Sequence, residues 1–221
     1  VVSKQRKLVI DIVSDTVWPW CFVGKRRLEK AIEKAKTILP DIEFDISWRP
    51  FQLNPSAEEG KGVNKLEMYN KKFGKERVAA MVPHMTAVGK EEGINFSYGG
   101  YTGNTFDSHR IILAAKEQGG AELQNQVVES LFKAYFEDEK SMGDHEVLLD
   151  YAGRAGMNEV SALLSDSAMY RDDVQAEILA YGKQCQGVPM FIVDHRFALS
   201  GAQDADALLQ VFQQALSKQW R

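Results

Sequence analysis

Apolar residues occupy nearly every position from 8 to 13, and this run ends at Ser14. Such a run is typical of a strand covered on both faces, as in a parallel or mixed sheet flanked by helices. After a turn over residues 15–19, apolar positions recur at helical spacing, which predicts a helix that ends before Pro40. Residues 42–49 then alternate between apolar and polar, which predicts a second strand. The start of the chain therefore has the pattern of a βαβ unit.

The middle of the chain, from about residue 64 to about residue 184, has helical periodicity in almost every segment. One predicted helix stops before Gly119–Gly120, another follows, and Asp144 is predicted to cap the start of a further helix. Residues 93–103 are rich in glycine and tyrosine, which predicts a loop that serves either as the wall or lid of a site or as a plain connector.

The end of the chain returns to strands. Residues 187–193 and 196–200 predict a hairpin that turns through Asp194–His195. An amphipathic helix follows, and its inner face carries Leu208, Leu209, Phe212 and Leu216. The order βαβ, a block of helices, then ββα predicts an α/β fold with a helical insertion.

The composition narrows the expected partners. Of the 221 residues, 44% are hydrophobic and 26% are charged, which is an ordinary globular balance. A net charge of -4 provides no basic surface, so neither nucleic acid nor a membrane is expected as a partner. Asp11 interrupts the apolar run near the start, and no later stretch approaches a membrane span, so we expect a cytoplasmic protein. The four histidines have no metal-ligand spacing, so no metal site is expected.

Four blocks of sequence resemble one family of proteins. They are residues 14–29 (SDTVWPWCFVGKRRLE), 49–55 (RPFQLNP), 104–110 (NTFDSHR) and 187–189 (GVP). In this order they resemble the DsbA-like family of the thioredoxin fold, and within it the FrnE-type subgroup, in which Val-Cys-Pro-Trp-Cys-Tyr-Ile-Gly precedes the first helix. The resemblance implies a thioredoxin-like core with a mixed sheet, formed by residues 1–62 and 180–221, and an all-helical domain inserted over residues 63–179.

One position departs from the family pattern. Aligned on Pro19, Trp20 and Cys21, the family's first cysteine falls on Trp18. In the family this cysteine lies at a helix N-terminus, which lowers its pKa, and it attacks disulfides. Tryptophan cannot be this nucleophile, so dithiol exchange through the motif is excluded. Cys21 is then either a weakly reactive thiol or a packing residue, and Cys185 is expected to be structural. A disulfide between the two is disfavoured in the cytoplasm.

The resemblance also implies where a ligand binds. In the family the residue before a cis proline, here Val188, pairs in β fashion with an extended peptide or with the cysteinyl part of glutathione. The glutathione-using relatives, kappa-class glutathione transferases and hydroxychromene-carboxylate isomerases, hold the γ-glutamyl end at the turn that corresponds to residues 201–203. The candidate catalytic residues are Cys21, Ser14 and Asn104. The candidate ligand-binding residues are Trp18, Pro19, Trp20, Asn54, His109, Val188, Pro189, Gly201, Ala202 and Gln203.

Structural interpretations compete with several of these assignments. Ser14 belongs to a strand end, Asn54 is a turn former, and Asp107 and Arg110 share a helix face as an ion pair. Trp18 and Trp20 are also expected to line an apolar pocket between the two domains.

Three functions follow as hypotheses. The first is a glutathione-dependent isomerase or transferase, in which the glutathione thiol is the nucleophile that isomerises a small conjugated substrate. The second is a monothiol disulfide oxidoreductase that uses Cys21. The third is a non-catalytic member that binds a small molecule or a partner at the apolar surface around Trp18 and Trp20. A small-molecule substrate is the expected partner, and a homodimer is a further expectation.

Overall fold

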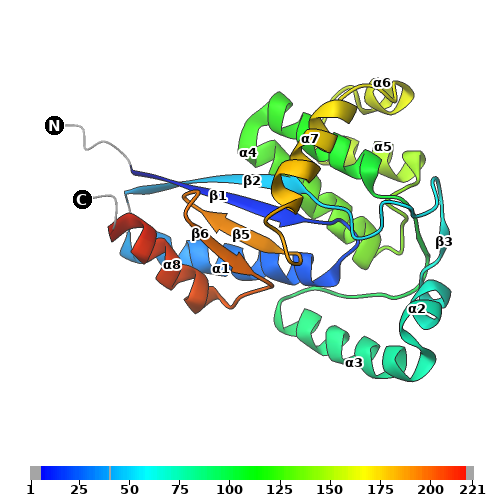
Figure 1. The fold of residues 1–221 in the computed structure, drawn as a ribbon, viewed down its shortest axis with the longest axis horizontal. Coiled ribbons are helices and arrows are strands. Elements are labelled where there is room, and N and C mark those ends of the chain that lie inside the picture. The colour runs from blue at the N-terminus through cyan, green and yellow to red at the C-terminus, as the bar shows by residue number, and fades with distance from the viewer. Residues whose placement is uncertain (1–5, 40, 218–221) are drawn as a thin grey trace.

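A mixed four-stranded sheet forms the centre of the protein in the computed structural model, which describes residues 6–39 and 41–217 (Figure 1). The strand order is β2-β1-β5-β6. The strands are β1 (Arg6–Ser14), β2 (Ile42–Pro50), β5 (Met190–Val193) and β6 (Phe197–Ser200). β1 and β2 are parallel, whereas β5 is antiparallel to both of its neighbours.

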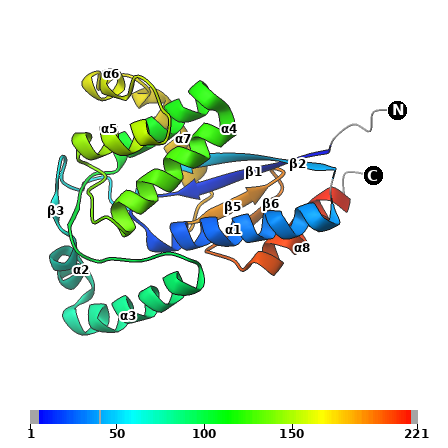
Figure 2. The same cartoon turned by 180° about the vertical axis from the view of Figure 1, so that it is seen from behind.

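Helices cover both faces of this sheet. α1 (Pro19–Ile38) and α8 (Ala205–Ser217) lie side by side on one face, and α4 and α7 lie on the other (Figures 1 and 2). Because β1 is covered on both sides, its residues from Ile10 to Ser14 are all buried, as the apolar run predicted. In α8, Leu208, Phe212 and Leu216 are buried and Leu209 is half-buried, which confirms the expected inner face.

Residues 63–182 form the remaining elements. They are β3 (Val63–Asn64), α2 (Lys65–Phe73), α3 (Lys75–Glu91), β4 (Tyr101–Thr102), α4 (Phe106–Phe136), α5 (His145–Arg154), α6 (Val160–Ser165) and α7 (Arg171–Gly182). The backbone of α4 leaves helical geometry at Gly119 and Gly120, where the sequence predicted a break. The β3–β4 ladder was not predicted, because strands of two residues are too short to show alternation.

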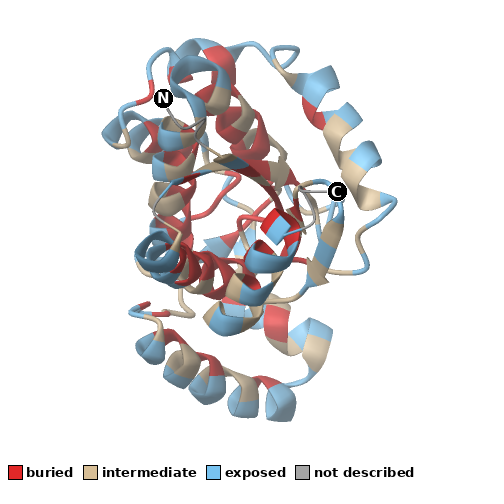
Figure 3. Ribbon diagram, turned by 90° about the vertical axis from the view of Figure 1, so that its left-hand side faces the viewer, coloured by how far each residue is buried: buried red, intermediate tan, exposed pale blue. Residues whose placement is uncertain are grey.

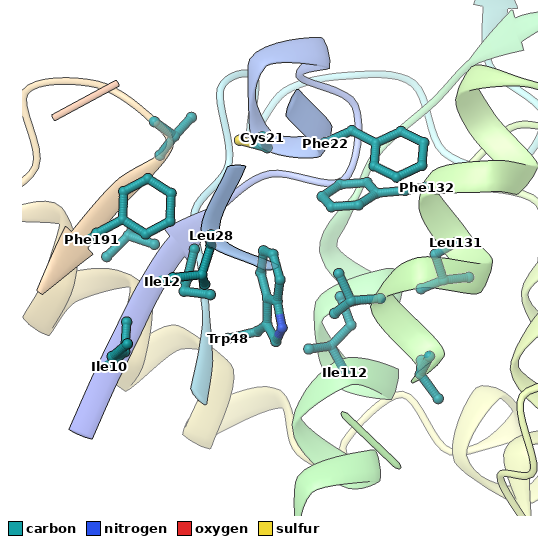
Figure 4. Packing of buried hydrophobic residues seen from close by; sticks show 14 of the residues in the cluster. Ile10, Ile12, Cys21, Phe22, Leu28, Trp48, Ile112, Leu131, Phe132 and Phe191 are labelled. Carbon is teal, nitrogen blue, oxygen red and sulfur yellow. The ribbon is translucent and has the colours of Figure 1, made fainter. Parts of the chain in front are cut away.

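The core extends from the sheet into the helical segment. Ile10, Ile12 and Phe191 line the sheet, and Trp48 bridges toward α4, where its ring meets Phe132 edge-on at 5.9 Å between centroids (Figure 4). Figure 3 shows the buried residues gathered in the sheet and on the inward faces of the helices around it. One contiguous apolar cluster therefore joins both parts of the chain.

Several local expectations are confirmed. Asp194 and His195 both have positive φ at the β5–β6 turn, and the Asp144 side chain accepts a hydrogen bond from the Glu146 N–H at the start of α5. α1 ends at Ile38, and Pro40, which was predicted to follow it, lies outside the described residues. Among residues 6–39 and 41–217, no helix combines the length and apolarity needed to span a bilayer.

Candidate functional site

The N-terminus of α1 forms the centre of the candidate site. Trp18 is the N-cap residue, Pro19 is the first helical residue, and Cys21 follows within the first turn, where its N–H donates to the Trp18 carbonyl at 2.9 Å. The Trp18 side chain makes no capping hydrogen bond, and the first turn contains no acidic residue. Trp18 and Trp20 are half-buried against the core cluster.

The environment of Cys21 keeps its sulfur protonated. The side chain is 0% exposed, and burial raises the pKa of the Cys21 thiol to about 12, which a hydrogen-bonding contact with Ser14 offsets only in part. Cys185 is half-buried, its Sγ donates to the Gly187 carbonyl at 3.1 Å, and burial raises its pKa as well. Both cysteines are free thiols. Neither is a ready thiolate at neutral pH.

A buried polar cluster holds the turn that leads into α1. The Asp15 carboxylate is 1% exposed, accepts a hydrogen bond from the Leu53 N–H at 2.8 Å and lies 3.3 Å from the His109 Nε2. The Thr16 and Ser108 hydroxyl oxygens are 2.9 Å apart. His109, a candidate ligand-binding residue, is thus a buried partner of Asp15, and it ties the start of α1 to α4.

Asn104, a candidate catalytic residue, uses its whole amide within the protein. Its Oδ1 accepts from the Gln52 side chain at 3.0 Å and from the Phe106 N–H at 2.9 Å. Its Nδ2 donates to the carbonyls of Pro55 and Ala57 at 3.0 and 3.2 Å. Asn104 therefore fastens the loop after β2 to the start of α4.

The structural interpretations of Asn54 and the Asp107–Arg110 pair are confirmed. Asn54 is exposed and its Oδ1 accepts from the Ser56 N–H at 3.2 Å, which is an Asx turn. The Arg110 Nη1 donates to the Asp107 Oδ1 at 2.8 Å on one face of α4. Ser14 is the last residue of β1, where its carbonyl accepts from the Phe51 N–H.

The loop before β5 contacts α1 directly. The Val188–Pro189 peptide bond is cis, and a Cβ built on Gly24 would lie 3.0 Å from the Pro189 Cγ. Within the described part of the chain, no residue hydrogen-bonds the backbone N–H or carbonyl of Val188. Val188 is only 7% exposed, and its backbone polar groups beside α1 have no hydrogen-bond partner among the described residues.

The turn over residues 201–203 lies next to this loop. The Gly201 N–H donates to the Pro189 carbonyl at 2.8 Å and the Gln203 N–H donates to the Gly201 carbonyl at 2.9 Å, so only the Ala202 N–H of the three is unbonded among the described residues. The Arg27 Nη1 donates to the Ala202 carbonyl at 2.7 Å, which brings a cation to the turn. Sequence reasoning missed Arg27, because it lies in the charged stretch of α1 and far from residue 202 along the chain.

A cavity of about 850 Å³ lies away from the α1 N-terminus. It is bounded by residues 52–60, the first turns of α4 and α5, and the α6–α7 segment, and Asn104 is among its lining residues. Neither Trp18 nor Trp20 lines it.

These features together define the class of the protein. The family model of the DSBA-like thioredoxin domain matches residues 9–213, so the chain belongs to this family. The β2-β1-β5-β6 sheet with helices inserted between β2 and β5 is accordingly a thioredoxin fold with a helical insertion.

Known relatives span nearly the full chain. A probable DsbA oxidoreductase from Streptomyces coelicolor is 33% identical, with a TM-score of 0.85, and the match covers 95% of this chain and 90% of that one. The uncharacterized protein YwbO of Bacillus subtilis is 29% identical over 212 residues, which are 94% of this chain and 95% of YwbO. A 2-hydroxychromene-2-carboxylate isomerase shares the fold, with a TM-score of 0.64 and 13% identity over 96% of this chain and 97% of that one. Proteins similar in sequence or in fold thus include a probable oxidoreductase and an isomerase.

Proposed function

We propose that this protein is a glutathione-dependent isomerase or transferase that acts on a small conjugated substrate at the N-terminus of α1. The main observation that supports this proposal is a contrast between the Cys21 thiol, at the start of α1, and the backbone of Val188. Cys21 is buried and protonated, whereas the backbone of Val188 is unpaired beside the same helix. A site without a thiolate of its own, but with a free backbone edge, suits a ligand that brings its own sulfur.

The residues present fit the two ends of glutathione. The Val188 N–H and carbonyl suit β-type pairing with the cysteinyl residue. The Ala202 N–H and the Arg27 guanidinium suit the γ-glutamyl carboxylate, since Arg27, Lys30 and Glu92 together leave one net positive charge at this turn. Two of the three turn N–H groups are already bonded, and Arg27 donates to Glu92 through Nε and to the Ala202 carbonyl through Nη1, so the anion would be held by the Arg27 Nη2 and the Ala202 N–H.

When bound, glutathione would supply a thiol that adds reversibly to a conjugated double bond, which permits rotation and release with no net oxidation. The chain would orient this thiol through Val188 and exclude water with the indoles of Trp18 and Trp20. The contact between Asp15 and His109 would hold the turn before α1 in place.

Titration of reduced glutathione, followed by calorimetry, tests the binding. Arg27→Gln is expected to weaken binding about tenfold, because one charge-assisted contact is lost. Arg77→Gln, an exposed arginine on α3, is the matched control and is expected to bind as the parent does. Absence of heat at glutathione concentrations up to about 10 mM would overturn the proposal.

Isomerisation of a cis-enone, followed by ultraviolet absorbance, tests the chemistry. The rate is expected to require glutathione, to vanish with S-methylglutathione, and to persist in Cys21→Ser. Loss of activity in Cys21→Ser together with turnover of a disulfide would instead support the monothiol oxidoreductase. Glutathione binding with no turnover of any kind would leave a non-catalytic binding protein.

A further inference from the structure

We propose that the cavity beside α7 is a second binding site, which takes a small organic monocarboxylate with an apolar body and holds its carboxylate on Arg171. The cavity measures about 850 Å³, which lies within the range of small-molecule sites. Its lining includes neither Trp18, Val188 nor the 201–203 turn, so the site is separate from the proposed glutathione site.

The walls of the cavity carry apolar side chains that the fold itself covers only in part. Leu179 and the half-buried Ile178 come from α7 and the half-buried Phe106 from α4, while Leu164 of α6 lines the cavity as a buried core residue. Leu179 is 65% exposed, the highest fraction among the exposed large hydrophobic residues described. An apolar ligand body would remove this surface from water.

Arg171 lines this cavity and has no ion pair among the residues that the structure describes. Its Nε donates to the Ser167 carbonyl at 2.8 Å, and its guanidinium carbon lies 5.7 Å from the centroid of the Phe106 ring. In the described ranges, no carboxylate lies within ion-pair distance of Arg171, and neither Nη atom is hydrogen-bonded. The edge of its guanidinium is thus available for a two-point contact with a carboxylate.

The other cation at the cavity is already occupied. The Arg110 guanidinium donates to Asp107 and to the carbonyls of Leu163, Asp166 and Met169. Arg171 is therefore the arginine that an anionic ligand can engage without breaking existing hydrogen bonds.

One of the acidic groups at the cavity is paired with cations or imidazole: Asp107 bonds to both Arg110 and the His145 Nε2, the latter at 2.7 Å. Asp144 accepts only the Glu146 N–H at the start of α5. Neither Asp144 nor Glu59, on the 52–60 wall, has a cationic partner among the described residues, and their charges disfavour a ligand with two carboxylates. This distribution selects a monocarboxylate.

Calorimetric titration of the full chain with 2-naphthoate and with neutral 2-naphthamide tests the proposal. The acid is expected to bind about tenfold tighter than the amide, and Arg171→Gln is expected to remove this preference. Arg77→Gln serves as the matched control and should retain it. Leu179→Ser, at a position that is already exposed, is expected to weaken both ligands severalfold without unfolding the protein.

Three affinity measurements can each overturn the proposal, in addition to a competition experiment: equal affinity for acid and amide, no binding of 2-naphthoate below about 5 mM, or full affinity in Arg171→Gln. Saturating glutathione should leave naphthoate binding unchanged, and competition between them would place both ligands at one site and refute the second site. If the protein binds naphthoate but does not bind glutathione, the proposed function is refuted and the second binding site is not. If Arg171→Gln does not fold, the proposal is tested by the ratio of acid to amide affinity in the parent protein and by the affinities of Leu179→Ser.

Discussion

Replacing Arg110 by methionine should destabilise the protein strongly, because this buried cation closes the C-terminal end of α6. Arg110 is 1% exposed, and its Nε donates to the Met169 carbonyl at 2.7 Å while its Nη2 donates to the Leu163 carbonyl at 2.8 Å and to that of Asp166. Methionine keeps the apolar stem but offers no donor. The change leaves these carbonyls and the Asp107 carboxylate without the cation.

Removing one partner from a buried charged network costs about 3–5 kcal/mol. Asp107 keeps His145 and is 28% exposed at its side chain, which favours the lower part of that range. We therefore expect Arg110→Met to lower the free energy of unfolding by about 3 kcal/mol, a large share of the stability of an ordinary domain.

Urea unfolding followed by circular dichroism measures this difference. Arg154→Met is the matched control, because Arg154 is 67% exposed and pairs with Asp150 on the surface of α5, where such a pair contributes less than about 1 kcal/mol. Amide hydrogen exchange in α6 should accelerate in Arg110→Met and stay unchanged in Arg154→Met. A loss below about 1 kcal/mol in Arg110→Met would refute the reasoning.

Three further predictions rest on separate contacts. A thiol reagent at pH 8 should label at most Cys185 in the native protein and label Cys21 only after unfolding, so equal native labelling of both would contradict the burial argument. Although burial opposes it, the contacts of Glu129 with Arg26 and Lys25 lower the pKa of its carboxyl from 4.5 to about 2. Glu129→Gln should therefore lower the free energy of unfolding by about 2 kcal/mol at pH 7. Urea unfolding should show that this difference between variant and parent shrinks as the pH falls below about 4.5 toward 2, and a difference that stays constant with pH would contradict the prediction. Gly24→Ala should lower the unfolding free energy by about 1–2 kcal/mol, because its Cβ would lie 3.0 Å from Pro189 and 3.1 Å from Phe191. Gly153→Ala in α5 should raise the unfolding free energy, because its Cβ would meet no atom within 4 Å. Shifts of the same sign in the two variants would count against the packing explanation.

The core strands and helices could be predicted because their patterns extend over enough residues. Residues 8–14 and 42–49 show the burial and alternation of strands, and α8 shows an unbroken helical face. Pro189 was predicted to be cis from its sequence block, and it is. The β3–β4 ladder could not be predicted, because its pairing depends on where distant loops meet.

The contacts within the candidate sites could be predicted only in part. Asp15 and His109 both lie in recognisable blocks, but their pairing across 94 positions is a tertiary contact that spacing does not reveal. Arg171 and Glu59 come from segments far apart in the sequence and line one cavity only in the folded chain. Asn104 is prominent in the sequence, yet its amide is used to hold a loop. A conspicuous polar residue can therefore serve geometry alone.

The uncapped start of α1 has one more consequence. α1 has 20 residues, Trp18 makes no capping bond, and no acidic side chain in the first turn offsets the positive end of the peptide dipoles. This electrostatic potential favours the thiolate of a sulfhydryl in the proposed glutathione site, whereas burial outweighs it at Cys21. Such acidification would come from the peptide backbone. An alanine scan of the site would leave it intact, and no single side chain would account for it.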